Sequence, residues 1–261
     1  MNSLQRYTCK AAIIGLCLAA ASGAYAQFGT PPINSAVITP RVWNDFPGAV
    51  GNYVNSYPGS ITLGESGQYN TGPSGFANRD IWQFSNDGST AYTLQAGDTT
   101  FTASMSLDVT GATTVDNEAG FIIPNANGSF GGGDLQFIAD PQSGFLGFFG
   151  GPGYWNSGFT YVAGTDITLQ IAYWQTGATG NMQFSVTDGT TVTSPVQSWT
   201  GNLVGDVLGG YFQLQGIDNS AGPGTSGQAV FDDISIVPEP SVLAMLGLGL
   251  LPLARLLRRR I

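Results

Sequence analysis

The feature that most constrains the fold of this chain is a strict alternation of apolar and polar residues that recurs along its middle. In residues 101–110, apolar side chains at every odd position alternate with threonine, serine and aspartate at every even one, and residues 167–174 show the same period. A period of two places successive side chains on opposite faces of a β-strand, whereas a helix needs a period near 3.6. Residues 182–187 repeat the pattern and precede Asp188-Gly189, a dipeptide that favours a tight hairpin turn.

Shorter apolar runs separated by glycine-rich breaks extend this pattern over the body of the chain. Breaks such as residues 131–133 and 150–153 separate the runs, and no repeat of fixed period occurs. The five Trp and 15 Phe of the chain favour a packed core over disorder. Residues 27–237 are therefore predicted to be all-β, a two-sheet antiparallel jelly-roll sandwich. Further strands are expected at residues 60–63, 80–84, 91–94, 119–123, 135–139, 145–149, 210–214 and 229–237.

Charge is distributed very unevenly between the body and the ends. Residues 27–237 contain 16 acidic residues, and Arg41 and Arg79 are their only cations, so the body has a net charge of −14. Nucleic-acid surfaces need clustered lysine and arginine, which excludes nucleic acid as a partner. The chain has no histidine, and both cysteines lie within the first 26 residues. This excludes Ser-His-Asp and Cys-His catalysis and ordinary zinc sites from the body.

Residues 1–26 are typical of a secretory signal peptide. Arg6 and Lys10 form its positive start, residues 11–21 form an apolar stretch too short to span a bilayer, and Ala24-Tyr25-Ala26 is a small-x-small cleavage sequence. A buried N-terminal helix is the alternative. Cleavage after residue 26 removes both cysteines, so the mature protein has no disulfide and depends on its core or on a bound metal.

The C-terminal tail, residues 238–261, carries the most specific motif of the chain. Pro238, Glu239 and Pro240 precede an apolar run over residues 242–253, and the chain closes with the cationic cluster Arg258, Arg259 and Arg260. This order resembles the PEP-CTERM sorting tail of exported bacterial proteins. The resemblance implies an exosortase-type processing enzyme as a partner, which cuts near the Pro-Glu-Pro motif and releases or re-anchors the body.

The physical properties of the tail agree with a membrane anchor. As a helix, residues 242–257 span ~24 Å at ~1.5 Å per residue, short of the ~30 Å hydrocarbon core, and Arg255 can reach the interface by snorkelling. The terminal arginines stay cytoplasmic by the positive-inside rule. We expect a single membrane helix and a protein that is exported through the inner membrane, transiently anchored, and then located at the cell surface or secreted. An amphipathic tail lying on the membrane is the alternative.

Parts of the body are also similar to known sequences. Residues 74–79, 84–88, 117–121 and 208–211 resemble recurrent phrases of uncharacterised exported PEP-CTERM proteins. Residues 231–236 are similar to the last strand of carbohydrate-binding jelly rolls and laminin-G-like domains. This resemblance implies a fold but no particular ligand, because sandwiches have many unrelated functions.

Carboxylates are the remaining candidates for acid–base catalysis in a body without histidine, cysteine or lysine. Glycoside hydrolysis needs two of them facing each other across a sugar. Glu65 and Glu118 are the only glutamates of the body, and Asp116 shares a strand face with Glu118 if that segment is extended. The Glu-x-Asp-x-x-Glu pattern of lectin-like glucanases is absent. We therefore interpret these groups as solvated loop carboxylates and predict no catalytic residues and no enzymatic activity.

Aromatic side chains that stack on sugar rings are the ligand candidates. Trp174 falls on the face opposite to the apolar residues of the predicted strand 167–174, and Trp155 lies beside Tyr154 in a Gly/Pro-rich loop. Each of these tryptophans either binds a sugar or packs against the sandwich, since aromatic residues also dominate cores. Trp82 is predicted to lie in the core.

The last predicted strand contains a conflict that points to a structural calcium ion. A period of two over residues 229–237 places Asp232 on the same face as Ile234 and Ile236. An unpaired carboxylate is costly to bury, and calcium accepts carboxylate ligands readily. Asp45 is expected to contribute to the same site, because jelly rolls often bring their terminal strands together. The alternative is a β-bulge that turns this aspartate and the next to solvent.

These features predict an exported surface or extracellular-matrix protein that is processed at its C-terminal signal and has a structural or interaction role without catalysis. A carbohydrate-binding module that recognises exopolysaccharide is the alternative, followed by a glycoside hydrolase. Exposed aromatic platforms and sugar binding distinguish the first two functions, and turnover of polysaccharide identifies the third.

Overall fold

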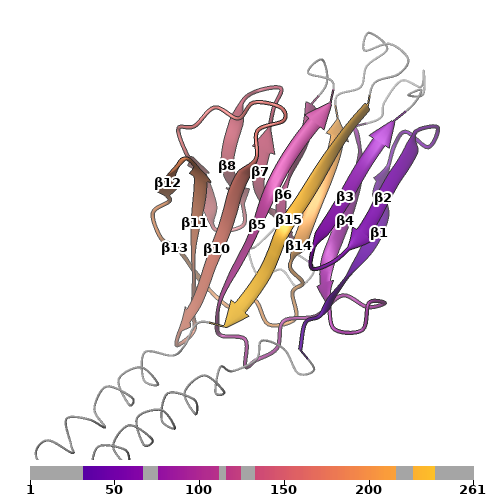
Figure 1. Ribbon diagram of the computed structural model, residues 1–261. Coiled ribbons are helices and arrows are strands. Elements are labelled where there is room, and N and C mark those ends of the chain that lie inside the picture. The colour runs from indigo at the N-terminus through magenta and orange to yellow at the C-terminus, as the bar shows by residue number, and fades with distance from the viewer. Residues whose placement is uncertain (1–31, 67–75, 112–115, 125–132, 216–225, 239–261) are drawn as a thin grey trace, which may run out of the picture. The chain divides into compact units, whose positions relative to one another are not determined.

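The computed structural model describes residues 32–66, 76–111, 116–124, 133–215 and 226–238. Every regular element in this part of the chain is a β-strand, and the strands form two antiparallel sheets (Figure 1). The predicted all-β, two-sheet antiparallel fold is therefore confirmed. The predicted signal peptide and the tail from Glu239 onward lie outside the described residues. Within the described ranges, no helix is long and apolar enough to cross a membrane.

The first sheet has seven strands, which come from both ends and the middle of the sequence. Neighbouring strands in it are all antiparallel. Its order is β1 (Ser35–Asn44), β4 (Ala77–Ser85), β14 (Gly209–Gln215), β6 (Asp116–Ile123), β7 (Leu135–Asp140), β8 (Phe145–Gly150) and β9 (Gly153–Asn156).

The second sheet has eight strands, and the chain passes repeatedly from one sheet to the other. Figure 1 shows β5 and β15, at its centre, running in opposite directions. The order is β12 (Thr190–Thr193), β11 (Thr179–Asp188), β10 (Ile167–Thr176), β5 (Thr100–Gly111), β15 (Ser226–Pro238), β3 (Ser60–Ser66) and β2 (Val50–Ser56), with β13 (Gln197–Thr200) also paired to β11.

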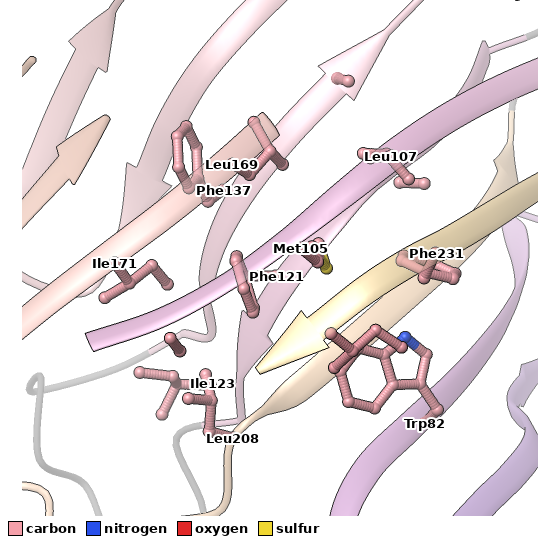
Figure 2. Close-up of a cluster of buried hydrophobic side chains, with 14 of the residues drawn as sticks. Trp82, Met105, Leu107, Phe121, Ile123, Phe137, Leu169, Ile171, Leu208 and Phe231 are labelled. Atoms are coloured by element: carbon pink, nitrogen blue, oxygen red, sulfur yellow. The ribbon is translucent and has the colours of Figure 1, made fainter. Parts of the chain in front are cut away.

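The hydrophobic core lies between the two sheets (Figure 2). Phe148 of the seven-stranded sheet stacks on Phe184 of the eight-stranded sheet at 3.9 Å between ring centres. Trp82 of the seven-stranded sheet also contacts Phe231 of the eight-stranded sheet, edge to face, at 5.8 Å between ring centres. Trp82 is fully buried, as predicted. Burial of apolar surface at ~25 cal/mol per Å² makes these inward faces the main stabilising feature of the described residues, which contain no cysteine.

The alternating segments predicted the strand positions well, because each has one buried and one outward face. In β10 the buried residues alternate with exposed or half-buried ones over residues 167–174. The predicted hairpin is also present: β11 ends at Asp188, Gly189 has a φ of 65°, and β12 begins at Thr190. The prediction was wrong at residues 91–94, where only an isolated bridge between Thr93 and Val207 forms.

Candidate functional site

One row of side chains crosses four neighbouring strands on the outward face of the seven-stranded sheet. Trp43 of β1 lies opposite Arg79 of β4, Arg79 lies opposite Gln213 of β14, and Gln213 lies opposite Glu118 of β6. We call these four residues the cross-strand row. Opposite residues on antiparallel strands have Cβ atoms roughly 5 Å apart, so the row forms one continuous set of contacts.

Arg79 links the aromatic and the polar ends of this row. Its guanidinium carbon lies 3.6 Å from the centre of the Trp43 ring and 5.4 Å from that of Tyr211, within the range of cation–π contacts. Its Nε donates to Oε1 of Gln213, and its Nη1 forms an ion pair of 2.8 Å with Oδ2 of Asp134. The guanidinium is therefore fixed in position by rings, an amide and a carboxylate.

Glu118 ends the row as a buried acid. Nε2 of Gln213 donates to its Oε1 at 2.9 Å, and Nε2 of Gln215 donates to its Oε2 at 3.3 Å. Burial raises its pKa to about 7; Arg79 opposes the shift and Asp140 adds to it. At neutral pH the carboxyl group is therefore present in both its charged and its protonated form, and it can accept or donate a hydrogen bond.

Two buried polar atoms on this face make no hydrogen bond within the described residues: one is beside the row, and the other belongs to Gln136, which lies opposite Ile122, four residues along β6 from Glu118. The hydroxyl of Tyr211 lies beside Glu118 but, within the described residues, makes no hydrogen bond of acceptable geometry, and the same holds for Nε2 of Gln136. A buried polar group without a partner costs roughly 1–3 kcal/mol. Such atoms mark unused hydrogen-bonding capacity on this face of the sheet.

The same face carries apolar and aromatic residues around the polar row. Tyr211 packs with Ile81, Ile122 and Ile138 in a second hydrophobic cluster, separate from the core. Exposed aromatic rings stand at both edges of the sheet, one pair on the side of β1 and β4 and the other on β8 and β9. They are Trp43 (40% exposed), Phe76 (56%), Phe149 (40%) and Tyr154 (65%).

The edge rings are paired with other rings. Trp43 lies 5.8 Å from Phe76, and Tyr154 stacks with Phe145 at 5.9 Å. The face therefore has exposed aromatic rings at its two edges, whereas the polar row between them is buried, with Arg79 4%, Gln213 2% and Glu118 7% exposed. Seven strands at ~4.8 Å spacing give a span of roughly 29 Å between the edge strands, which suits an extended ligand.

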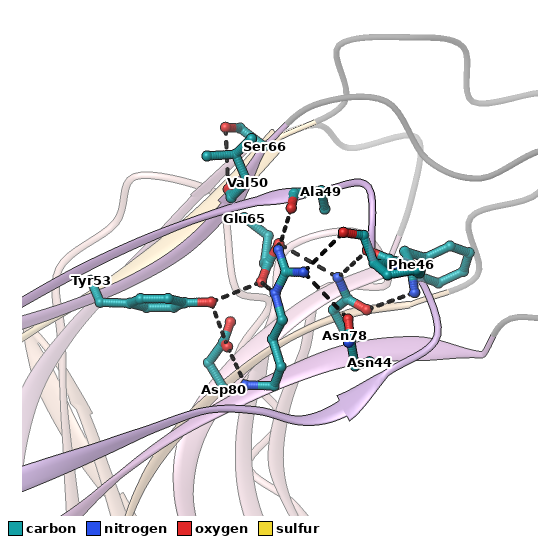
Figure 3. Close-up of polar contacts among 11 residues, drawn as sticks. Asn44, Phe46, Ala49, Val50, Tyr53, Glu65, Ser66, Asn78 and Asp80 are labelled. Atoms are coloured by element: carbon teal, nitrogen blue, oxygen red, sulfur yellow. Dashed lines mark hydrogen bonds and ion pairs between the residues drawn. The ribbon is translucent and has the colours of Figure 1, made fainter.

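A second polar cluster lies inside the sandwich, between β1, β2, β3 and β4 (Figure 3). Arg41 donates from Nε and Nη2 to the two carboxylate oxygens of Glu65, each at 3.1 Å. The Tyr53 hydroxyl shares its one proton between Glu65 Oε1 at 3.0 Å and Asp80 Oδ1 at 2.9 Å, and Nδ2 of Asn78 donates to Glu65 Oε2 at 3.5 Å. The Arg41 backbone N–H also donates to Asp80.

This internal cluster serves to hold strands together. Burial raises the pKa of Asp80 to about 7, although the backbone N–H of Arg41 opposes the shift. Because Arg41 and Glu65 pair in a bidentate geometry, we assign the cluster a structural role. Glu65 was predicted to be a solvated loop carboxylate, and so was Glu118. Both predictions are wrong: the two glutamates are buried on strands β3 and β6.

The predicted ligand candidates lie on different sheets and do not form one site. Trp155, on β9, is half-buried and packs against Phe137 at 6.5 Å and Phe148 at 6.4 Å. Its position therefore favours the packing alternative. Trp174 is half-buried on the outward face of β10, opposite Asn181 of β11, as the alternation predicted.

The predicted burial of Asp232 is wrong. The buried residues of β15 in this region are Phe231 and Ile234, and the two aspartates between them are exposed. Asp233 has a φ of 49°, so an irregularity interrupts the alternation and turns both carboxylates to solvent, as in the alternative of a bulge. The reason for placing calcium at Asp232 thus disappears.

The structure does not bring Asp45 to Asp232. Oδ2 of Asp45 accepts the backbone N–H groups of Phe76 and Ala77 at the start of β4, beside the internal cluster. Asp232 lies opposite Ser60, five residues along β3 from Glu65, or roughly 17 Å at ~3.4 Å per residue. The described ranges contain no group of three or more carboxylates that could hold a metal ion.

Sequence reasoning missed most of the row. Arg79 was noted only as a rare cation, and Trp43, Gln213 and Tyr211 were not singled out. The signal that could have found them is the period of two: Tyr211, Gln213 and Gln215 alternate with the apolar Phe212 and Leu214 along β14, on the same face as Glu118 across the sheet.

Comparison with known proteins identifies no family. No family model matches the chain, and no curated protein matches it. Among solved structures, an alginate lyase from Pseudomonas aeruginosa has a TM-score of 0.44 at 13% identity, over 72% of this chain and 86% of the lyase. A Lotus tetragonolobus seed lectin has a TM-score of 0.42 at 12% identity, over 83% of this chain and 98% of the lectin. A GH131 β-glucanase catalytic domain from Podospora anserina has a TM-score of 0.39 at 16% identity, over 69% of this chain and 72% of that domain's chain.

Proposed function

We propose that the protein is an exported, surface-sorted jelly-roll protein whose sandwich binds a neutral polysaccharide without cleaving it. The ligand lies on the outward face of the seven-stranded sheet. In this proposal an exosortase-type enzyme processes the PEP-CTERM tail, and the body then acts at the cell surface or in the extracellular matrix.

The observation that carries the binding proposal is the cross-strand row with exposed aromatic rings at both edges of its sheet. Exposed aromatic rings stack on the apolar faces of sugars. The buried guanidinium, amide and carboxyl groups of the row contact Trp43 and one another, and so hold this face of the sheet rigid between the rings. A net charge of −14 over residues 27–237 repels polyanions, which favours an uncharged polymer.

The test removes one ring at each edge. We expect Trp43→Ala and Tyr154→Ala each to weaken the retention of the protein in affinity gels that contain neutral polysaccharides. Trp174→Ala is the matched control, because it removes an aromatic ring from the outward face of the other sheet. Retention that depends on Trp174 and not on Trp43 or Tyr154 would contradict the assignment of this face.

A second candidate function is glycoside hydrolysis, and Glu118 is the observation that favours it. A carboxyl group with a pKa of about 7 suits a general acid at neutral pH. A second carboxylate is close by: Ala119 of β6 pairs with Ala139 of β7, so the next position in this register places Asp140 opposite Glu118. Release of reducing ends from a polysaccharide by the intact protein, lost in Glu118→Gln, would identify a hydrolase.

A further inference from the structure

A hollow lies on the outward face of the eight-stranded sheet, the sheet opposite to the one that carries the cross-strand row. It has a volume of about 280 Å³ and is lined by residues of β2, β3, β5 and β15. Three glycines contribute to it, and the side chains around them are amides and hydroxyls. The glycines are Gly64, Gly111 and Gly227; the polar side chains that line the hollow are Asn52, Ser66, Thr110, Ser226 and Gln228.

A glycine of the lining occupies the centre of an outward row of residues. Gly64 of β3 lies opposite Asn52 of β2 on one side and opposite Gln228 of β15 on the other. A Cβ atom at Gly64 would lie 3.0 Å from the Cβ of Gln228 and 3.2 Å from the carbonyl oxygen of Gly227. Gly64 therefore allows β15 to approach β3 closely at this point, and Asn52 and Gln228, on either side of Gly64, both line the hollow.

The chemistry of the hollow is polar and uncharged. The side chain of Glu65 points into the sandwich, where Arg41 neutralises it, so no free charge lines the hollow. Neither Asn52 nor Gln228 forms a side-chain hydrogen bond within the described residues. Each amide offers a donor and an acceptor, which is the complement of two neighbouring sugar hydroxyls.

We propose that this hollow is a second binding site, for a single uncharged sugar residue, held between the amides of Asn52 and Gln228. The inference extends the proposed function, because the two sites lie on opposite sheets of one sandwich. A protein with two sites on opposite faces joins two polysaccharide chains, and a polymer that reaches both sites is held more tightly than at either site alone.

The hollow is tested directly by NMR titration with methyl glycosides of glucose, galactose and mannose. We expect the side-chain NH₂ signals of Asn52 and Gln228 to shift with one of these sugars. Asn52→Ala or Gln228→Ala should weaken its affinity about three- to tenfold, the effect of losing one hydrogen bond. Gln170→Ala is the matched control, since Gln170 is an exposed amide on the outward face of β10.

The outcomes separate the two sites. If the signals of Asn52 and Gln228 do not shift with any of the sugars, or if Gln170→Ala weakens binding as much as Gln228→Ala does, the hollow is not a sugar site. If instead the site on the seven-stranded sheet is wrong, the protein's retention in affinity gels will be unchanged by Trp43→Ala. Turbidity of a mixed polysaccharide solution should require both sites, and persistence of the turbidity in Gln228→Ala would overturn the cross-linking role.

Discussion

At the scale of single residues, Glu118 shows how a carboxyl group is accommodated in a buried position on a sheet. It is held by two glutamine amides and faces Arg79 along the row, yet burial outweighs these contacts and raises its pKa to about 7. Asp80 has a pKa raised in the same direction by burial. Each of these acids binds a proton more tightly in the folded chain than in the unfolded chain.

This difference makes the stability depend on pH with a definite sign. Between pH ~5 and ~7 the folded chain holds more protons than the unfolded chain, so the free energy of unfolding falls as pH rises through this window. For Glu118 alone the fall is on the order of 3 kcal/mol, at ~1.4 kcal/mol per unit of pKa shift. Urea unfolding of the protein and of Glu118→Gln at pH 5 and pH 8 measures it. We expect a clearly smaller fall in the variant; equal slopes would show that Glu118 does not titrate in this window.

Asp232 provides the opposite case of an acid whose burial was predicted and did not occur. Because its side chain is exposed beside the left-handed Asp233, we expect Asp232→Ala to change the free energy of unfolding by less than ~1 kcal/mol, as surface substitutions do. Thermal melts should give the same small change with calcium and with excess chelator. A loss of several degrees that appears only with calcium would restore the predicted metal site.

At the scale of elements, the irregular part of β1 determines how the sandwich is joined at one end. The pairing of β1 with β4 shifts register between Thr39 and Trp43, and Arg41 takes a φ of 53° in this interval. The shift directs Arg41 inward to Glu65, while Trp43 lies against Arg79 on the outward face. The same irregularity in β1 thus places Arg41 in the internal cluster and Trp43 in the cross-strand row.

Removal of the Arg41 side chain should therefore be costly. In Arg41→Met the fully buried Glu65 carboxylate loses its cation, which we expect to lower the free energy of unfolding by about 3 kcal/mol. Arg41→Met combined with Glu65→Gln should recover part of this loss, because the uncompensated charge is gone. Chemical denaturation of the two variants measures the difference. A double variant less stable than Arg41→Met would contradict the role of the ion pair.

At the scale of the whole molecule, the proposal places different tasks in different parts of the chain. In this proposal the two ends of the chain carry the export and sorting signals, the core between the sheets supplies stability, and the outward faces carry the binding groups. The tail accounts for four of the eight cations of the chain, so its removal leaves a strongly acidic body. Such a charge keeps a secreted protein soluble.

The mass of the mature protein tests this division. We expect the form released into the medium to begin near Gln27 and to end near residues 238–241, which intact mass spectrometry measures at both ends together. Released protein that still contains Arg258, Arg259 and Arg260 would rule out processing of the tail. A Pro238→Ala, Pro240→Ala double variant should accumulate in the uncut form.

The sequence by itself determined the class of fold and the positions of most strands, because the period of two and the glycine breaks are local properties of the chain. It also determined that the body lacks histidine, cysteine and lysine. Its prediction failed where the backbone departs from this period, at Asp232 in β15, and it did not find the site. Trp43, Arg79, Glu118 and Gln213 are far apart in the sequence, and only the pairing of β1, β4, β14 and β6 makes them neighbours. Pairing between distant strands depends on how the two sheets bury their inward faces together, which no short segment encodes.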